Sequence, residues 1–238
     1  MAEHHNQHHG HGHDFAKANK DHFDKDSHTY DELHKVKEVT EKEAKYILSE
    51  GWSFNPESTT VLNFACGTGL LERDLVAYCK SIQGVDISQG MVDQYNKRAE
   101  TLGVTSKMNA VVCELKGVAE ELEGRKFDVV LCTMAYHHFE SIDEITRILA
   151  YFLKPGGALL VTDRVSSDAE LKIEDVPENY EAIVPHKAGF SEEEMRKLFE
   201  GAGLGSFSMN VIPGVTMDDI LPGLINQKLF LAKGVKPL

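Results

Sequence analysis

Apolar residues follow two different periods along this chain, and the change of period marks its elements. Between residues 15 and 50, Val36, Val39, Ile47 and Leu48 recur on one helical face, with charged residues between them. From residue 59 onward, short apolar runs alternate with segments of helical spacing, and these runs predict buried strands. The predicted strands cover residues 59–65, 81–86, 107–114, 127–133, 158–163, 206–212 and 227–233.

The alternation of strands and helices predicts the fold class. Apolar strands separated by helices are typical of a parallel sheet covered on both faces, which indicates a doubly wound α/β fold. The last two predicted strands are joined by a loop, and we expect them to form an antiparallel pair at one end of the sheet. Capping boxes at Ser141 with Glu144 and at Ser191 with Glu194 predict where two helices begin.

Three segments make up the predicted domain organisation. Residues 1–14 form a histidine-rich tail that we expect to be disordered, because its histidines and glycines have no apolar partner to pack against. Residues 15–56 form a helical cap, and residues 57–238 form the α/β domain. Residues 166–187 interrupt the strand–helix rhythm, and we expect this segment to determine the specificity of the site.

The histidine-rich tail raises the question of a metal site. Paired imidazoles bind zinc, nickel or copper, but a mobile tail binds such ions only incidentally. We therefore expect no functional metal site. The incidental ligands would be His4, His5, His8 and His9.

The composition of the chain argues against nucleic acids and membranes as its partners. The formal net charge is −13, and an acidic chain without a basic stripe repels phosphate backbones, so we expect no nucleic-acid substrate. No apolar run reaches the ~18 residues that a membrane span needs. The four cysteines form no C-x-x-C pair, which is typical of reduced, buried thiols. We expect a cytoplasmic protein without a membrane partner, and the sequence leaves monomer and homodimer open.

The segment VLNFACGTG contains the most informative loop. The first strand ends at Ala65, and Cys66, Gly67, Thr68 and Gly69 then turn the chain into a helix. Small residues there let backbone N–H groups approach a ligand, with the helix N-terminus behind them. Nineteen residues beyond Gly67, the second strand ends at Asp86, whose carboxylate can accept hydrogen bonds from a ribose.

Two classes of cofactor use such a loop. Dinucleotides favour a third glycine, which lets the helix pack under a pyrophosphate. The residue at that position is Glu72, whose carboxylate we expect to face and repel a pyrophosphate. A cofactor that has ribose but no phosphate suits the loop better, and S-adenosylmethionine is the common one.

Four elements then resemble one family. ACGTG after the first strand, VDIS after the second, FDVVL at the fourth and LKPGG before the fifth together resemble class I (Rossmann-like) S-adenosylmethionine-dependent methyltransferases. The closest resemblance is to the small-molecule branch of the ubiquinone- and menaquinone-biosynthesis type. It implies a seven-stranded, mostly parallel sheet with an antiparallel last strand and an N-terminal helical lid. It also implies S-adenosyl-L-homocysteine as the product and a small-molecule acceptor.

The resemblance also assigns cofactor-binding residues. The lid, from Phe23 to Tyr30, would fold over the methionine end. Asp86 would hold the ribose diol. The full set of implied cofactor-binding residues is Tyr30, Asn63, Ala65, Cys66, Gly67, Thr68, Gly69, Asp86, Ile87, Met91, Glu114, Leu115 and Thr133. The family usually has an acidic residue where this chain has Asn63, and the lost charge is expected to weaken binding of the cofactor's ammonium group.

Three histidines are candidate catalytic bases. His137 and His138 follow the fourth strand, where the family's active site opens, and His186 resembles a position that faces the pocket. Histidine titrates near neutrality and can remove a proton from an acceptor. The structural alternative is that they cap the following helix or pack beneath the lid.

The acceptor itself is left open. The chain has no (D/N)PP(Y/F) motif after the fourth strand, which argues against base amines and glutamine amides as acceptors. We expect O-, N-, S- or C-methylation of a small organic molecule. Two alternatives are a methyltransferase-like protein that binds or regulates without catalysis, and a nicotinamide oxidoreductase.

Overall fold

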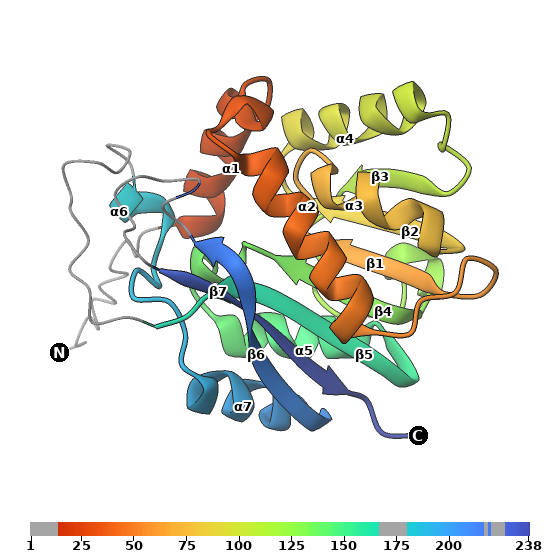
Figure 1. Cartoon of the computed structure of the whole chain (residues 1–238), viewed down its shortest axis with the longest axis vertical. Helices are drawn as coiled ribbons and strands as arrows, with labels where there is room; N and C mark the ends of the chain where they lie inside the picture. The colour runs from red at the N-terminus through yellow and green to blue at the C-terminus, as the bar shows by residue number, and fades with distance from the viewer. Residues whose placement is uncertain (1–13, 167–179, 217–218, 220–226) are drawn as a thin grey trace, which may run out of the picture.

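Seven strands form one sheet in the order β3-β2-β1-β4-β5-β7-β6 (Figure 1). The computed structural model describes residues 14–166, 180–216, 219 and 227–238. The strands are β1 (Thr60–Phe64), β2 (Ser81–Asp86), β3 (Met108–Val112), β4 (Phe127–Thr133), β5 (Leu153–Arg164), β6 (Gly205–Thr216) and β7 (Lys228–Val235).

Six of these strands run in the same direction, and the last one, β7, runs against them. β1 pairs in parallel with β2 and β4, β2 with β3, and β4 with β5. β7 lies between β5 and β6 and is antiparallel to both. The predicted α/β fold, with a mostly parallel seven-stranded sheet and an antiparallel last strand, is therefore confirmed.

The helices lie on both faces of this sheet. In chain order they are α1 (Phe15–Asp26), α2 (Val36–Tyr46), α3 (Leu70–Leu75), α4 (Gln89–Leu102), α5 (Ile142–Tyr151), α6 (Tyr180–Ile183) and α7 (Glu192–Gly201). Helices α2, α3 and α4 share one apolar core with the sheet. Helices α5 and α7 share a second core on the opposite face (Figure 1).

In the described part of the chain, five short helical turns lie in the connections between these elements. They are the 3₁₀ turns η1 (Tyr30–Glu32), η3 (Val76–Tyr78), η4 (Glu121–Gly124) and η5 (Tyr136–His138), and the π-helical turn η2 (Ile47–Gly51). The helical segment predicted for residues 15–50 is thus two α-helices separated by η1, with η2 closing the second.

Two local predictions differ from the structure. Ser191 and Glu194 form the expected capping box, but the Ser141 side chain makes no capping hydrogen bond to α5. Ser141 has ψ 82°, whereas Ser191 has ψ 159°, and this rotation removes the capping geometry. The strand predicted at residues 158–163 begins earlier than expected, because β5 starts at Leu153 and its pairing with β4 shifts register after Phe127.

The lid, which we define as α1 and η1 together, is tied to the loops beneath it. The Asp24 carboxylate on α1 accepts hydrogen bonds from Ser88 Oγ at 2.7 Å and from the Gly90 amide at 3.1 Å. The Asp31 carboxylate on η1 accepts a hydrogen bond from Thr68 Oγ1 at 2.6 Å and pairs with Arg98. These bonds hold the lid against the loops that follow β1 and β2.

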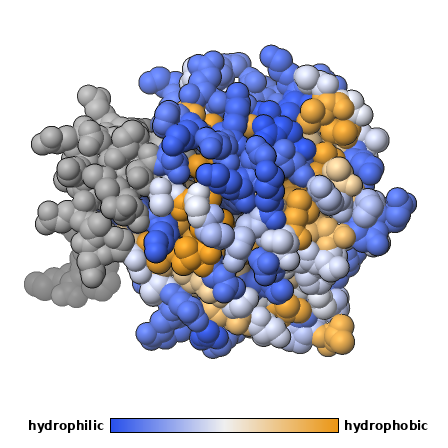
Figure 2. Space-filling view, in the orientation of Figure 1, coloured by the Kyte–Doolittle hydropathy of each residue, from blue (hydrophilic) through white to orange (hydrophobic). Residues whose placement is uncertain are grey.

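The outer side of the N-terminal helices is hydrophilic (Figure 2). On α2 the residues Lys37, Glu38, Glu41 and Lys45 are exposed, while Val36 and its neighbours on the opposite stripe are buried. In the part of the chain that the structure describes, no helix is long and apolar enough to cross a bilayer. The cytoplasmic location stays a prediction.

Some predictions fall outside the described residues. Residues 1–13 lie there, so the predicted disorder of the tail and its incidental ligands His4, His5, His8 and His9 stay predictions. Most of residues 166–187 lies there too, but its end forms α6. The domain boundaries 1–14, 15–56 and 57–238 also stay predictions.

The Asp24 contacts generate a prediction about the lid. Burial acts to raise the pKa of Asp24, but hydrogen bonds from Lys20, Ser88 and Gly90 outweigh it and lower this pKa to about 2. The contribution to stability is therefore complete above the ordinary pKa of about 3.8 and is lost as the pH falls towards 2. At pH 7, Asp24→Ala should raise amide hydrogen exchange across residues 15–26.

The control is Asp21→Ala, which removes an exposed carboxylate that pairs with Lys17 on the same helix. Exposed pairs of this kind contribute little, so exchange in the control should match the wild type. Equal protection of residues 15–26 in all three proteins would show that Asp24 does not fasten the lid.

Candidate functional site

Two adjoining pockets lie at the carboxyl ends of the parallel strands, beneath the lid. The smaller has a volume of about 170 Å³ and the larger about 260 Å³. Ligands of doubly wound sheets bind at this edge, where the connections leave the strands on opposite sides. Residues of both walls are Phe23, Tyr30, Ala65, Gly67, Thr133, Met134 and His138.

The loop after β1 turns through the left-handed region of backbone space three times. Ala65 has φ 55°, Gly67 φ 55° and Gly69 φ 78°. A Cβ built on Gly67 would meet no atom within 4 Å, so the loop presents bare backbone to open space. A Cβ on Gly69 would lie 2.9 Å from the Tyr95 ring, so glycine there lets the loop pack against α4.

Asp86 connects this loop to the end of β2. Its Oδ2 accepts a hydrogen bond from the Gly67 amide at 2.9 Å, and its Oδ1 accepts one from the Ser88 amide at 2.9 Å. Burial raises the pKa of Asp86, while these backbone donors oppose the rise. Each carboxylate oxygen keeps a second lone pair, which is available to a ligand in the smaller pocket.

Most of the predicted cofactor-binding residues line these pockets. The smaller pocket is lined by Tyr30, Ala65, Gly67, Asp86, Ile87, Met91, Glu114 and Thr133 from that prediction. The larger pocket adds Cys66 and Thr68. Asn63, Gly69 and Leu115 line neither pocket. Gly69 is the left-handed residue before α3, and the Leu115 side chain is buried in the core.

Asn63 is paired with a carboxylate that sequence reasoning placed elsewhere. Its Nδ2 donates a hydrogen bond to Glu72 Oε1, and both side chains are buried. Glu72 is 0% exposed, so the expectation that it faces a ligand at the loop is wrong. The helix α3 turns it inward, where burial raises its pKa to about 7 against the opposing hydrogen bond from Asn63.

His137 forms a buried pair with Asp163, the residue near the end of β5. His137 Nδ1 lies 3.0 Å from both Asp163 oxygens, and its backbone amide donates to Oδ2 at 3.1 Å. Burial lowers the pKa of His137, and the Asp163 charge opposes that shift. Burial also opposes ionisation of Asp163, but His137 and Arg164 outweigh it and lower the pKa of this carboxyl.

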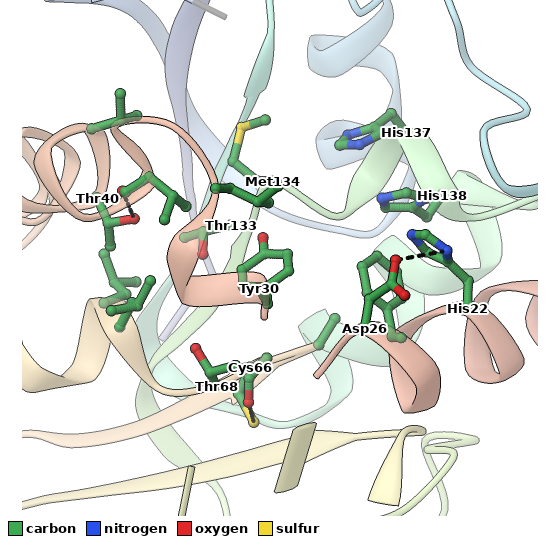
Figure 3. Close-up of a pocket in the computed structure, with 18 of the residues that line it drawn as sticks. His22, Asp26, Tyr30, Thr40, Cys66, Thr68, Thr133, Met134, His137 and His138 are labelled. Atoms are coloured by element: carbon green, nitrogen blue, oxygen red, sulfur yellow. Dashed lines mark hydrogen bonds and ion pairs between the residues drawn. The ribbon is translucent and has the colours of Figure 1, made fainter. Parts of the chain in front are cut away.

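His138 lies beside His137 at the junction of the two pockets (Figure 3). Its Nδ1 is 2.8 Å from the Ile183 carbonyl, which can only accept, so Nδ1 carries the proton. The Phe23 ring of the lid packs edge-on against it, with ring centroids 5.3 Å apart. Burial and the neighbouring His137 hold the pKa of His138 well below its ordinary value.

His186 lies outside both pocket walls. Its amide donates to the His137 carbonyl at 3.3 Å, and its ring packs on Phe190 with centroids 5.4 Å apart. Among the described residues, no group is within hydrogen-bonding distance of its buried Nε2. His186 therefore supports the His137 turn from behind, which departs from the expectation that it faces the pocket.

Sequence reasoning missed two carboxylates of the site. Asp163 stands at the end of a continuous apolar strand, and an acidic residue at that position could have indicated a site residue. Glu43 lies on α2 and lines the larger pocket, but its surroundings in the sequence resemble an exposed helix face. Nothing in the sequence places it beside β5.

Comparison with known proteins gives the class. Residues 61–157 match the methyltransferase domain family. An uncharacterized methyltransferase of Schizosaccharomyces pombe is 35% identical over 152 residues, which cover 62% of this chain and 54% of that protein. A ubiquinone biosynthesis O-methyltransferase of Rickettsia bellii is 29% identical, over 43% of this chain and 40% of its own. The chain thus spans about half or less of these relatives' length.

A solved structure shares the fold. Phosphoethanolamine N-methyltransferase 2 of Haemonchus contortus, with phosphomonomethylethanolamine and S-adenosylhomocysteine, matches with a TM-score of 0.71 at 15% identity, over 94% of this chain and 61% of that one. Residues 61–157 therefore carry a methyltransferase domain, and the sheet that contains them has the fold of this solved methyltransferase. This confirms the resemblance on which the sequence interpretation rests.

The Asn63–Glu72 pair generates a prediction about stability. The pKa of Glu72 is about 7 in the folded protein against an ordinary value of 4.5, so its contribution to stability falls as the pH rises from 4.5 to 7. Asn63→Asp places a second acid against Glu72. It should lower the free energy of unfolding by ~3 kcal/mol at pH 8, where the folded pair opposes the second negative charge that the unfolded chain carries, and by less at pH 5.5.

The double variant Asn63→Asp with Glu72→Gln exchanges the acid and the amide. It should recover most of the lost stability, because a single carboxylate again faces a single amide. Urea unfolding at the two pH values measures both effects. A single Asn63→Asp variant as stable as the wild type at pH 8 would contradict the buried pairing.

Proposed function

We propose that this chain binds S-adenosylmethionine in the smaller pocket and transfers its methyl group to a small molecule held in the larger one. The observation that carries the proposal is the junction of the two pockets at Ala65, Gly67 and Thr133, with a buried histidine–carboxylate pair on the larger side. A methyl donor and an acceptor must meet in line, and two connected pockets supply that placement.

The residues of the smaller pocket fit the nucleoside part of the cofactor. Asp86 has lone pairs for two ribose hydroxyls, and Ile87 and Met91 offer apolar surface to an adenine ring. Open space at Gly67 leaves room for the chain between ribose and methionine. When bound, the cofactor supplies an electrophilic methyl group on a sulfonium, and attack by the acceptor leaves the S–C electron pair on sulfur.

His137 is the residue best suited to remove a proton from an acceptor. Its contact with Asp163 holds Nδ1 protonated and leaves Nε2 as the free, basic nitrogen. The lowered pKa of His137 keeps it neutral at pH 7, and the Asp163 charge stabilises the cation that forms when it accepts a proton. Among the described residues, no carboxylate is hydrogen-bonded to the His138 ring, so we assign His138 to positioning the acceptor.

The acceptor is a small organic molecule in this proposal. The wall of the larger pocket combines the rings of Phe23, Tyr30 and Tyr180 with aliphatic groups such as Val39 and Ile183. Such a wall suits a molecule with an apolar body and a nucleophilic O, N, S or C atom. The similar proteins include one named as an O-methyltransferase and one named as an N-methyltransferase. These names therefore do not indicate which atom of the acceptor is methylated.

The first test is calorimetric titration of stripped protein with S-adenosylmethionine and S-adenosylhomocysteine. We expect affinity on the order of micromolar for at least one of them. Asp86→Ala should weaken it at least tenfold, because each charge-assisted hydrogen bond contributes about 1.5–3 kcal/mol. Asp93→Ala, an exposed change on α4, is the matched control. Undiminished affinity in Asp86→Ala would refute the ribose assignment, and no binding by folded wild type would refute the cofactor.

The second test addresses the base. His137→Ala should lower turnover by about 10²–10⁴, the usual contribution of general-base catalysis, and Asp163→Asn should lower it comparably by removing the charge that stabilises the protonated ring. Wild-type turnover should rise as the pH passes upward through the lowered pKa of His137, below its ordinary 6.5, and then level off.

An exposed histidine gives the control. His34→Ala, in the turn before α2, should leave the rate and its pH profile unchanged. Unaltered turnover of His137→Ala from pH 6 to 9 would exclude it as the base. Cofactor binding without turnover of any acceptor class would favour the alternative of a non-catalytic binding or regulatory protein.

A further inference from the structure

A buried carboxylate of α2 faces the larger pocket. The inward stripe of α2 consists of Val36, Val39, Glu43, Ala44 and, one turn on, Ile47, and all of them are buried. Glu43 is the acidic member of this otherwise apolar stripe and is 3% exposed. An ionised side chain is rarely kept at such a position without a partner, because removing it from water is costly.

The described surroundings of Glu43 leave its charge without a cation. Thr162 Oγ1 donates a hydrogen bond to Glu43 Oε1, and this is a neutral donor. Among the described residues that line the larger pocket, there is neither lysine nor arginine. Burial raises the pKa of Glu43 to about 7, and the nearby Asp163 charge adds to the rise against the opposing Thr162 bond.

Asp163, the next residue along β5 after Thr162, is an internal comparison. It is 0% exposed, yet His137 and Arg164 lower its pKa, because the fold surrounds that carboxylate with partners. Glu43 is buried to a similar degree, but the hydroxyl group of Thr162 is its one hydrogen-bond partner among the described residues. The fold thus compensates the charge of one buried carboxylate and leaves the other facing a cavity.

We propose that Glu43 receives a positively charged nitrogen of a molecule that occupies the larger pocket or extends into it from the smaller one. This inference rests on the proposed function of the site, because it concerns the ligands of that reaction. A cation would supply the missing counter-charge, and in a site sheltered from water such a contact is strong. The aromatic rings of Tyr30 and Tyr180 on the same wall add favourable surroundings for an ammonium group.

Two sources provide this chemistry. The first is the α-ammonium group at the amino-acid end of the cofactor. Asn63 is neutral and Glu72 is turned into the core, so neither residue presents a carboxylate to this group in the pocket. The second is an amine acceptor, which Glu43 would hold near the end of β5, where Asp163 holds His137. The two sources call for separate arms of one experiment.

The first arm compares S-adenosylhomocysteine with its deaminated analogue, in which hydrogen replaces the α-amino group. The second arm compares 2-phenylethylamine with 2-phenylethanol, and butylamine with 1-butanol, in protein saturated with S-adenosylhomocysteine. Calorimetry measures each affinity in the wild type and in Glu43→Gln. The matched control is Glu41→Gln, which alters an exposed carboxylate of the same helix that pairs with Lys45.

We expect the wild type and Glu41→Gln to prefer the ammonium-bearing member of a pair by tenfold or more in one arm. Glu43→Gln should bind both members of that pair equally. A preference in the first arm assigns the cofactor, and one in the second arm assigns an amine acceptor. The inference is overturned if the wild type shows no such preference in either arm, or if Glu43→Gln keeps it.

Failure of the proposed function gives a different result. In that case the wild type binds neither S-adenosylhomocysteine nor its analogue, and the second arm is run without them to decide the role of Glu43. Glu43→Gln conserves the side-chain shape and removes a buried acid, so it should melt no lower than the wild type. The preference of the wild type for the ammonium-bearing compound is measured without any variant. The inference can therefore be contradicted even if Glu43→Gln folds poorly.

Discussion

The geometry of the whole site depends on how the chain leaves β1. This strand lies between two parallel neighbours, β2 and β4. The chain therefore leaves β1 at the carboxyl edge of the sheet and must turn back over the sheet to form α3. Ala65, Gly67 and Gly69 accomplish the turn with positive φ, a conformation that is costly for most residues. The same turn exposes bare backbone at Gly67, and Asp86 holds it by accepting the Gly67 amide hydrogen bond.

Met134 repeats this constraint at the end of β4. It has φ 51°, and like Ala65 it lies in the wall of both pockets. Two neighbouring strands thus each end in a strained non-glycine residue at one edge of the sheet. Strain of this kind persists only where the surrounding structure fixes it, and it gathers at binding sites. The pockets are therefore a consequence of how adjacent parallel strands terminate.

The sequence predicts the sheet well, because period and strand ends are local properties. The observed β2 and β4 have the predicted bounds, and Gly67 with Asp86 come together as expected from strand ends alone. The misses depend on contacts distant in sequence. The direction of the Glu72 side chain depends on how α3 packs, and the burial of Glu43 depends on α2 lying against β5.

The lid bonds of Asp24 and Asp31 bear on the timing of ligand exchange. Ala16, Asn19 and Phe23 of α1 form part of the smaller pocket's wall, so the lid is a wall as well as a cover. Asp24 binds the first turn of the helix that carries Met91, and Asp31 binds Thr68 in the loop after β1. Opening that wall requires breaking bonds to both loops. A nucleoside in the smaller pocket would then leave only after these bonds break, so we expect its residence time to depend on the lid as well as on the pocket's own contacts.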